Sequence, residues 1–401
     1  MTDPRTLAIA DYTYDLPEER IAHHPLEERD ATKLLLWQKG RIADHGFREL
    51  PEFLPADALL VLNDTRVVQA RIAFRRTTGA LLECMVLRPE GDRPMEQALQ
   101  DVGTSRWWCM MGNAKRWKGE KLERVSDGHA LTAEREDLKD GEHLITFRWN
   151  DGGTFAEQLV RHGNMPLPPY MRREAEADDH VRYNTVFAQH NGSVAAPTAS
   201  LHFTPELLER VEQRGVHLAR VTLHVGAGTF LPVKGERMEE HAMHSEQVRI
   251  PKGTILALRE QLRTGAPIIP AGTTALRTIE SLYWHAADRV LGRAGAQLQV
   301  DQWRPYADQP EVPVEEALDA LLQGMGNEGA MEVSGSTRLL IAPGYRFRLA
   351  TGLITNFHQP NSTLLLLVAA LVGPEWKGIY QHALENGYRF LSYGDGSLLM
   401  P

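Results

Sequence analysis

Two loops, GSVAAPTASLHF at residues 192–203 and HVGAGTF at residues 224–230, decide the fold because they enclose one α/β unit. Helical periodicity runs from Thr204 to Gly215, and the strand-like VHLARVTLHV follows. Each loop is rich in small residues and carries one imidazole, His202 or His224. Small side chains let a ligand approach the backbone, and Gly adopts φ > 0 without steric cost. We expect the two loops to form the floor of a pocket.

Strand and helix alternate on both sides of this unit. A buried strand, Ala58 to Leu62, runs into the polar group Asn63-Asp64-Thr65-Arg66. Further along, APIIPAG precedes the helix ALRTIESLYWHAADRV, and LITNFH at 353–358 precedes the helix LLLLVAALV. Thr154 to His162 has a helical pattern, and Gly163 follows as a stop signal. Such alternation predicts an α/β fold with a mainly parallel, helix-covered sheet.

The sequence pattern changes between Val67 and Trp149. In this region short strand-like runs are separated by the turn signals TTG, PEGDRP, SDG and KDGE. Several short strands at regular spacing predict a small closed barrel or sandwich. We therefore expect a discontinuous α/β catalytic domain, residues 1–65 and 151–401, with a small β-barrel domain inserted at 66–150. The basic run at 115–118, KRWK, suits an exposed hairpin loop or an RNA contact.

One segment near the C-terminal half fits this scheme poorly. It contains a helical pattern, Val314 to Gln323, followed by GMGNEGAMEVSGS. The density of glycine predicts a mobile loop over that second part.

Composition narrows the class of protein. With 42% hydrophobic and 24% charged residues the chain is typical of soluble globular proteins. Its two cysteines give no disulfide framework and suit a reducing cytosol. The N-terminus has no secretory pattern, and the most apolar run, Leu364 to Val372, is about half a membrane span. The net charge of -9 argues against a protein that coats nucleic acid, although it allows a local basic patch.

Polar residues recur where predicted strands end and helices begin. Asn361 or Ser362 is placed to cap one helix and Thr273 another. Capping accounts for these residues individually, but free N–H groups at helix starts also suit an anionic or polar ligand. Capping does not explain why His202, His224 and His358 each stand at a strand–loop junction.

Other catalytic signatures are weak. His241, His244 and Glu246 form His-x-x-His-x-Glu, which lacks the spacing of a helical zinc site and has no evident fourth ligand, so we expect no metal. Hydrogen bonds to a ligand or a local network are the alternatives. There is no Gly-x-Ser-x-Gly elbow and no P-loop, and Gly226 with Gly228 is only the start of a dinucleotide fingerprint. Spacing alone leaves the reaction open.

The literal strings carry a closer resemblance. YDLPEERIAHHPLEERD, LNDTRVVQARI, MPLPPYMRRE, YNTVFA to SVAAPTASLHFT, VTLHVGAGTFLPVK, HAMHSE, AGTTALRTIES, LITNFHQPNSTLLLLVAAL and YRFLSYGD occur in this order along the whole chain. They closely resemble the S-adenosylmethionine:tRNA ribosyltransferase-isomerase family of queuosine biosynthesis. The resemblance also implies an α/β domain with an inserted β-barrel.

The resemblance implies a transferase that moves and isomerises the ribosyl group of its co-substrate, S-adenosyl-L-methionine. The acceptor is 7-aminomethyl-7-deazaguanine at the wobble position of tRNA, the product is epoxyqueuosine-tRNA, and adenine and methionine leave. We expect a cytoplasmic monomer that binds tRNA and S-adenosylmethionine, with no membrane partner and no metal.

Site residues follow from matching this chemistry to the chain. A modest base can remove a proton from the carbon beside a sulfonium, so His202, His224 and His358 are candidates for proton transfer, in no resolved order. Ribose and adenine would be oriented by Thr198, Ser200, Thr273, Thr274 and Asn356. Arg66 or Arg277 would take the methionine carboxylate or an RNA phosphate. The remaining substrate-binding candidates are Asp64, Gly226, Gly228, His241, His244, Glu246, Ser362, Tyr393 and Asp395.

The chain departs from the family pattern in three places. The family more often has Pro at Gln69, Leu at Gln359, and Tyr-Pro-Gly at Ala342-Pro343-Gly344. The region from Ala286 to Gly335 is also longer than expected. These changes affect the fine shape of the site rather than the reaction.

Two other classes of function remain as alternatives. An S-adenosylmethionine-dependent RNA methyltransferase would normally carry a glycine-rich nucleotide loop after its first strand, and none is present. A non-catalytic tRNA-binding protein that uses the barrel as a platform is opposed by the 7% aromatic content and the acidic balance.

Overall fold

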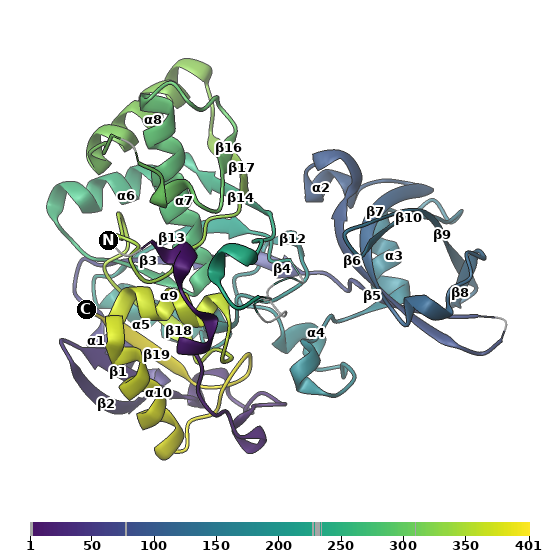
Figure 1. Ribbon diagram of the computed structural model, residues 1–401, viewed down its shortest axis with the longest axis horizontal. Helices are drawn as coiled ribbons and strands as arrows, with labels where there is room; N and C mark the ends of the chain where they lie inside the picture. Colours follow the sequence, from purple (N-terminus) through teal and green to yellow (C-terminus); the bar gives the residue numbers. More distant parts are fainter. Residues whose placement is uncertain (1–2, 77, 227, 229–232, 234, 309) are drawn as a thin grey trace.

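The computed structural model describes residues 3–76, 78–226, 228, 233, 235–308 and 310–401. It has a large lobe that contains both termini and a smaller β-rich lobe beside it (Figure 1). Part of the predicted pocket loop, residues 227 and 229–230, lies outside the described residues.

The large lobe is built on a ten-stranded sheet. From one edge to the other its strands are β16 (Leu298–Val300), β17 (Glu332–Thr337), β14 (Glu246–Pro251), β13 (His217–Leu223), β3 (Leu59–Asn63), β15 (Ile268–Ala271), β18 (Leu353–Asn356), β19 (Gly396–Met400), β1 (Lys33–Gln38) and β2 (Arg41–Gly46). The four central strands, β13, β3, β15 and β18, run parallel, with Leu59 opposite both His217 and Ile268.

The prediction of a mainly parallel sheet needs correction, because several outer strands of this sheet pair in the antiparallel direction. β14 runs antiparallel to β13 and to β17, and β19 runs antiparallel to β18. β2 returns against β1 through a tight turn in which Lys39 and Gly40 both have positive φ. Such a turn reverses the chain without a crossover, whereas parallel neighbours need one. The sheet is therefore mixed, with a parallel centre.

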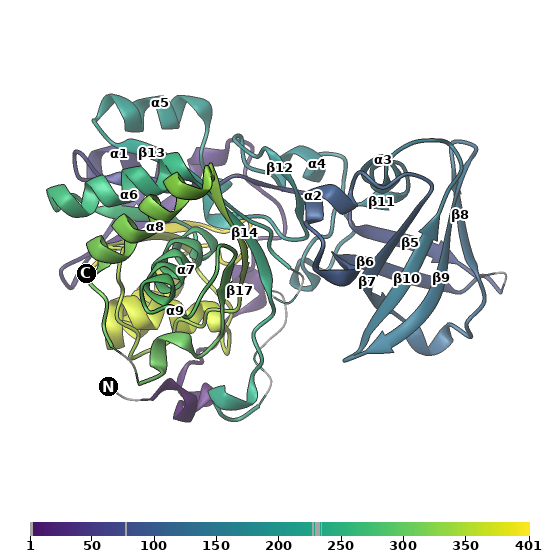
Figure 2. The same ribbon diagram turned by 90° about the horizontal axis from the view of Figure 1, so that it is seen from above.

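Helices cover both faces of the sheet, as the alternation predicted. On one face α1 (Leu50–Phe53) and α5 (Pro205–Gln213) pack against Leu60 and Leu62 of β3. On the other face, α6 (Lys252–Thr264), α7 (Thr273–Val290) and α8 (Val314–Glu328) pack against Leu59 and Val61. Figure 2 shows α5 on one side of the sheet and α7 on the other. Side chains alternate along a strand, so a wholly apolar β3 is required between two helical layers.

The C-terminal helices complete the second face. α9 (Thr363–Val372) and α10 (Trp376–Glu385) pack around Leu35 and Trp37 of β1 and Leu399 of β19. The stretch Thr363–Glu385 is long and apolar enough to cross a membrane by length and composition, and half of its apolar window is buried inside the protein. Burial of this kind is typical of a core helix.

The small lobe is a seven-stranded antiparallel sheet, which confirms the prediction that this region consists mainly of short strands. Its strands in spatial order are β11 (Gly163–Asn164), β5 (Arg71–Arg75), β6 (Leu81–Pro89), β7 (Thr104–Gly112), β10 (Glu142–Arg148), β9 (His129–Lys139) and β8 (Leu122–Ser126). Arg124 of β8 donates to the carbonyl oxygen of Ala73 in β5 over 2.8 Å, which brings the far ends of the sheet together. No backbone ladder joins β5 to β8 among the described residues, so the sheet is curled rather than closed by pairing.

The core of the small lobe extends past residue 150. α3 (Phe155–His162) inserts Phe155 and Leu159 among the strands, and the Phe155 ring stacks on Trp107 at 5.0 Å. Thr154 and Glu157 form a capping box at its start. Gly163 ends α3 with φ -94°, not in the left-handed conformation of a helix stop. A Cβ at residue 163 would lie 1.9 Å from the Gln69 carbonyl oxygen. Only glycine therefore allows the end of α3 to lie this close to the backbone that precedes β5.

Short elements connect the lobes. β4 (Thr65–Val67) pairs in parallel with β12 (His190–Ser193) near the centre of Figure 1. α2 (Met95–Ala98) of the small lobe lies against β12, and α4 (Asp179–Arg182) lies between the lobes.

The predicted mobile loop in the C-terminal half is wrong. α8 continues to Glu328, and β17 takes up much of the rest. Met325 is buried in the core, and Gly324 faces Arg289 of α7, where a Cβ would lie 2.9 Å from the guanidinium.

Candidate functional site

A pocket lies where the parallel strands β15 and β18 end. It holds about 690 Å³ of empty space, including open solvent at its mouth. Its walls come from the 195–199 loop, the start of α7, the segment after β18 and the start of α9. A crevice beyond the carboxyl ends of parallel strands is where α/β proteins bind ligands.

The structure brings six of the predicted site residues into the walls of this pocket. They are Thr198, Thr273, Thr274, Asn356, His358 and Ser362. The 192–203 loop therefore contributes to a pocket, as its composition predicted.

The two helix starts in the pocket differ in how they are capped. Ser362 accepts a hydrogen bond from the Leu365 N–H and caps α9, as predicted. Thr273 does not cap α7, because Gly272 is the N-cap residue, with φ 101° and no side-chain cap. The first N–H groups of α7 therefore stay uncapped where Thr273 and Thr274 line the pocket, a setting that favours a polar or anionic group.

His358 is the predicted imidazole that reaches the pocket. Its Nε2 lies 2.8 Å from the Thr355 hydroxyl, while the described contacts leave Nδ1 without a hydrogen-bond partner. Tyr380 accepts from its backbone N–H, and Tyr14 donates to its carbonyl oxygen, which clamps the residue. Burial lowers the pKa of His358 to about 3, so the ring is neutral near pH 7. A neutral imidazole with one free nitrogen can accept or donate a proton in the pocket.

His202 lies behind the pocket wall rather than in it. Its Nε2 is 2.9 Å from Asn356 Oδ1, and its Nδ1 is 3.0 Å from the Thr32 hydroxyl. The Asn356 amide already donates to the Leu391 carbonyl, so its Oδ1 accepts and Nε2 of His202 carries the proton. Burial lowers the pKa of His202 to about 4. The neutral ring orients Asn356 and has no free nitrogen for substrate.

His224 belongs to a different cluster, at the ends of β13 and β3. Its Nδ1 lies 2.8 Å from the Thr65 hydroxyl, and burial together with the nearby His190 and Arg249 lowers its pKa to about 4. Asn63 separates this cluster from the pocket, donating to the Leu223 carbonyl and to the Thr274 hydroxyl. His202 and His224 therefore belong to two separate clusters.

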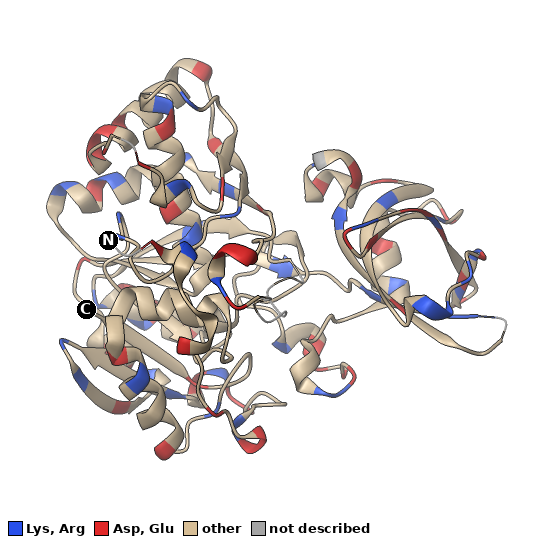
Figure 3. Ribbon diagram, viewed as in Figure 1, with Lys and Arg blue, Asp and Glu red and all other residues tan. Residues whose placement is uncertain are grey.

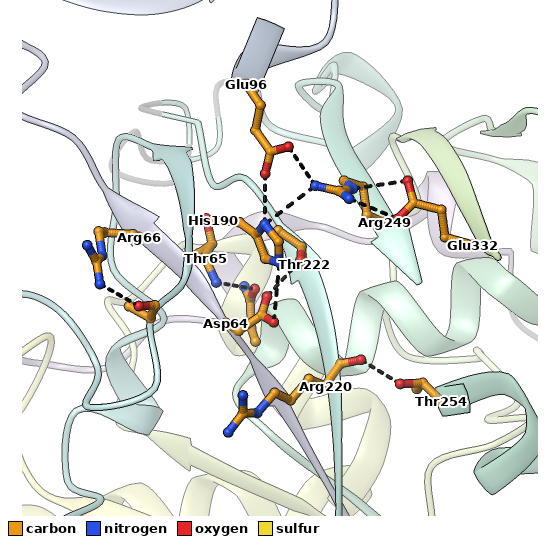
Figure 4. A network of polar contacts seen from close by, with 12 residues as sticks. Asp64, Thr65, Arg66, Glu96, His190, Arg220, Thr222, Arg249, Thr254 and Glu332 are labelled. Atoms are coloured by element: carbon orange, nitrogen blue, oxygen red, sulfur yellow. Dashed lines mark hydrogen bonds and ion pairs between the residues drawn. The ribbon is translucent and has the colours of Figure 1, made fainter. Parts of the chain in front are cut away.

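Asp64 starts a chain of polar contacts that crosses to the small lobe (Figure 4). Its Oδ1 accepts from Thr222 over 2.7 Å, and its Oδ2 lies 3.9 Å from Nε2 of His190. His190 Nδ1 in turn lies 2.8 Å from Glu96 of α2, which also binds Arg249 over 2.6 Å. Burial raises the pKa of Asp64. No local pattern indicated His190 or Glu96, because both are far from Asp64 along the chain.

Glu246 and Arg277 form a buried ion pair over 2.5 Å. The Gly226 N–H donates to the other Glu246 oxygen, and Arg277 also donates to the Leu339 carbonyl. One guanidinium nitrogen of Arg277, Nη2, is buried without a partner. The pair lies one helical turn beyond Thr273 on α7 and does not line the pocket.

The remaining predicted residues lie elsewhere. Buried Ser200 donates to the Ala271 carbonyl, and Asp395 accepts from the Lys33 and Arg389 backbone. Exposed Arg66 donates to the Ala188 carbonyl, and Tyr393 donates to Asp179. These four support local structure.

The His-x-x-His-x-Glu segment does not converge on one point. His244 lies against Gly228, where a Cβ would meet its ring at 2.0 Å, while the His241 carbonyl accepts from Gln302. Among the residues described, no group of three His, Cys, Asp or Glu side chains is arranged to hold a metal.

Sequence reasoning missed several wall and support residues. Tyr170, whose hydroxyl lies 2.6 Å from that of Ser392, lines the pocket together with Thr355. Tyr170 stands in MPLPPYM, which the pattern marked only as a rigid segment. Thr32 supports His202 from 170 positions away, a contact that no local pattern indicates.

Three known proteins similar to this chain over nearly its whole length carry closely related names. The family described as "Queuosine biosynthesis protein" matches residues 9–399. A protein of Chlorobium chlorochromatii is 40% identical over 98% of this chain and all of its own length, and one of Trichlorobacter lovleyi is 38% identical over the same shares. Both are named S-adenosylmethionine:tRNA ribosyltransferase-isomerase. A crystal structure of S-adenosylmethionine tRNA ribosyltransferase from Thermotoga maritima is 28% identical, covers 97% of this chain and 100% of its own, and has a TM-score of 0.47.

Proposed function

This chain belongs to the family of queuosine biosynthesis proteins, and from that premise we propose that it is an S-adenosylmethionine:tRNA ribosyltransferase-isomerase. The observation that carries the proposal is identity of about 40% over the whole length of relatives with that name. The enzyme transfers and isomerises the ribosyl group of S-adenosylmethionine onto 7-aminomethyl-7-deazaguanine at the wobble position of tRNA. Epoxyqueuosine-tRNA forms, and adenine and methionine are released.

S-adenosylmethionine is proposed to bind in the pocket at the ends of β15 and β18. Thr198, Thr273, Thr274 and Asn356 offer hydroxyl and amide groups for ribose and adenine. The uncapped start of α7 suits the polar end of the ligand. These features support a nucleoside ligand without a phosphate-binding loop.

The three candidate imidazoles are proposed to contribute to the reaction in three different ways. His358 is proposed to move a proton at the substrate through its Nδ1, because this nitrogen is unbonded in the pocket. His202 is proposed to act through Asn356. His224 is proposed to act at the neighbouring strand ends, together with Asp64.

The other predicted substrate contacts remain proposals; Ser362 lines the pocket, and the others lie outside its walls. They are Arg66, Ser200, Gly226, Gly228, His241, His244, Glu246, Arg277, Ser362, Tyr393 and Asp395. Arg277 with its unbonded Nη2 is the candidate for an anionic group beside the pocket.

Residues 66–150 are proposed to act as an inserted β-barrel domain, with residues 1–65 and 151–401 as the catalytic domain. Strands β5 to β10 of the curled sheet lie within residues 66–150 and support the insertion, while α3 and β11 complete the small lobe from beyond this boundary. We propose that the enzyme works in the cytoplasm as a monomer and uses no metal.

The deciding experiment supplies the protein with S-adenosylmethionine and tRNA that carries the aminomethyl-deazaguanine. Free adenine and methionine in equal amounts are expected. A methyltransferase would release S-adenosylhomocysteine instead, and a binding protein would release neither product.

A further inference from the structure

A second, smaller hollow lies on the far side of His202 from the main pocket. Two arginines face it, Arg29 from the N-terminal segment and Arg182 at the end of α4. Thr32, His202 and Ser392 also line it, and Ser392 lines the main pocket as well. The chain Thr32–His202–Asn356 therefore connects the two hollows by hydrogen bonds.

Both arginines are held in place by backbone carbonyl groups. Arg29 donates to the carbonyls of Val181 and Leu201 over 2.9 and 3.1 Å. Arg182 donates to those of Leu26 and Glu27 over 2.5 and 3.0 Å. The N-terminal segment and the α4 segment are thus held together by hydrogen bonds in both directions. Further N–H groups on both guanidiniums make no hydrogen bond to the described residues.

Neither of these two cations donates a hydrogen bond to a carboxylate in the part of the chain that the structure describes. The nearest recorded one is Asp178, 67% exposed, with its Oδ2 3.9 Å from Arg182. A third cation, Arg389, stands close enough to act on His202 and has Asp395 at 3.8 Å. Nε of Arg182 is buried without a hydrogen-bond partner.

The arrangement is unfavourable without a ligand. Burial and the neighbouring Arg182 charge lower the pKa of Arg29. Like charges in a partly desolvated site repel each other, and an unpaired buried donor costs free energy. An oxyanion between the two forks would neutralise the repulsion and accept the unused N–H groups, which guanidinium geometry suits well.

We propose that Arg29 and Arg182 form an oxyanion site that takes a backbone phosphate of the tRNA substrate. This assignment rests on the proposed function, since it needs an RNA partner. Cations and anions are interspersed over both lobes (Figure 3), and the net charge is -9, so RNA binding requires discrete sites of positive charge rather than a basic face. The carboxylate of S-adenosylmethionine is the other source of an oxyanion, but His202 and Asn356 stand between this hollow and the main pocket.

The test measures binding of unmodified tRNA across a series of salt concentrations for Arg29→Gln and Arg182→Gln. Each variant is expected to weaken binding about tenfold and to lower the slope of log Kd against log salt by about one. Affinity for S-adenosylmethionine, measured by calorimetry, is expected to stay within twofold. Arg259→Gln is the matched control, because Arg259 binds Asp319 on the surface, and it should leave both quantities unchanged.

Lysine variants keep the test informative if glutamine disturbs the packing of the two segments that carry Arg29 and Arg182. Arg29→Lys and Arg182→Lys retain the charge, so the salt slope should stay near that of the wild type while affinity falls a few-fold with loss of the fork. A salt slope in the glutamine variants equal to that of Arg259→Gln would overturn the proposal. So would a large loss of S-adenosylmethionine affinity with an unchanged slope, which would assign the site to the carboxylate. Failure of the wild type to release adenine would instead refute the proposed function.

Discussion

The Nε2 atom of His202 lies 2.9 Å from Oδ1 of Asn356, so an imidazole outside the pocket orients an amide in its wall. Replacing His202 by alanine leaves Asn356 Oδ1 and the Thr32 hydroxyl without this partner. We expect the free energy of unfolding to fall by about 1–3 kcal/mol and KM for S-adenosylmethionine to rise more than tenfold. Thr32→Val removes only the outer contact and should shift both in the same direction by less. Urea unfolding and steady-state kinetics measure these effects, and equal KM values for His202→Ala and wild type would contradict a role for the pair.

His358 is expected to matter for the chemical step rather than for binding. His358→Gln should lower the single-turnover rate of adenine release by about 10²–10⁴, since the free ring nitrogen is lost. S-adenosylmethionine affinity should change less than threefold. His382, which binds Asp44 at the surface, provides the control variant His382→Gln, whose rate should equal that of the wild type. A His358→Gln enzyme of normal rate would remove this residue from the mechanism.

Acid should destabilise the protein through its buried histidines. The pKa values of His202 and His224 are lowered to about 4, and that of His358 to about 3, from 6.5. The unfolded chain therefore binds protons that the folded chain does not, so stability is complete above pH 6.5 and falls as the pH drops toward 4. His202 and His224 each contribute roughly 3 kcal/mol to this loss and His358 roughly 5 kcal/mol once the pH falls below the folded-state pKa. Denaturant unfolding at pH 7 and pH 5 tests it, and His358→Gln should flatten the pH dependence.

The buried Glu246–Arg277 pair predicts a specific pattern of stability. Glu246→Gln leaves a buried guanidinium without its counter-charge, and a loss of about 3–5 kcal/mol in unfolding free energy is expected. Glu246→Gln combined with Arg277→Met removes the stranded charge and should recover part of that loss. Additive losses in the double variant, measured by urea unfolding, would show that the pair is not coupled.

Glu96 joins the small lobe to the large one through His190 and Arg249 (Figure 4). Glu96→Gln removes the charge from both contacts and should let the lobes separate more readily. Faster hydrogen exchange in β12 and a larger radius of gyration in X-ray scattering are expected. Glu142→Gln breaks an ion pair to Arg88 inside the small lobe and should leave the scattering curve unchanged. Identical curves for all three proteins would mean that other contacts hold the lobes.

Much of the fold could be predicted because its signals are local. The apolar run of β3, the Ser362 cap of α9 and the capping box at Thr154 depend on residues within one or two turns of each other. Strand direction at the sheet margins was less predictable, because β14 and β19 pair according to tertiary packing. The last turn of α8, which continues past Gln323 to Glu328, was missed for the same reason: Met325 packs in the core, and this packing outweighs the low helix propensity of the glycines.

The site divides in the same way. By itself the sequence determined that small residues and imidazoles stand at strand ends, and its literal strings indicated the family. Only the tertiary structure decided that His358 faces the pocket while His202 supports Asn356 from behind and His224 belongs to another cluster. The physical reason is that burial and hydrogen-bond partners set the role of an imidazole, and partners such as Thr32 and Thr65 lie more than 150 residues from the rings they bind.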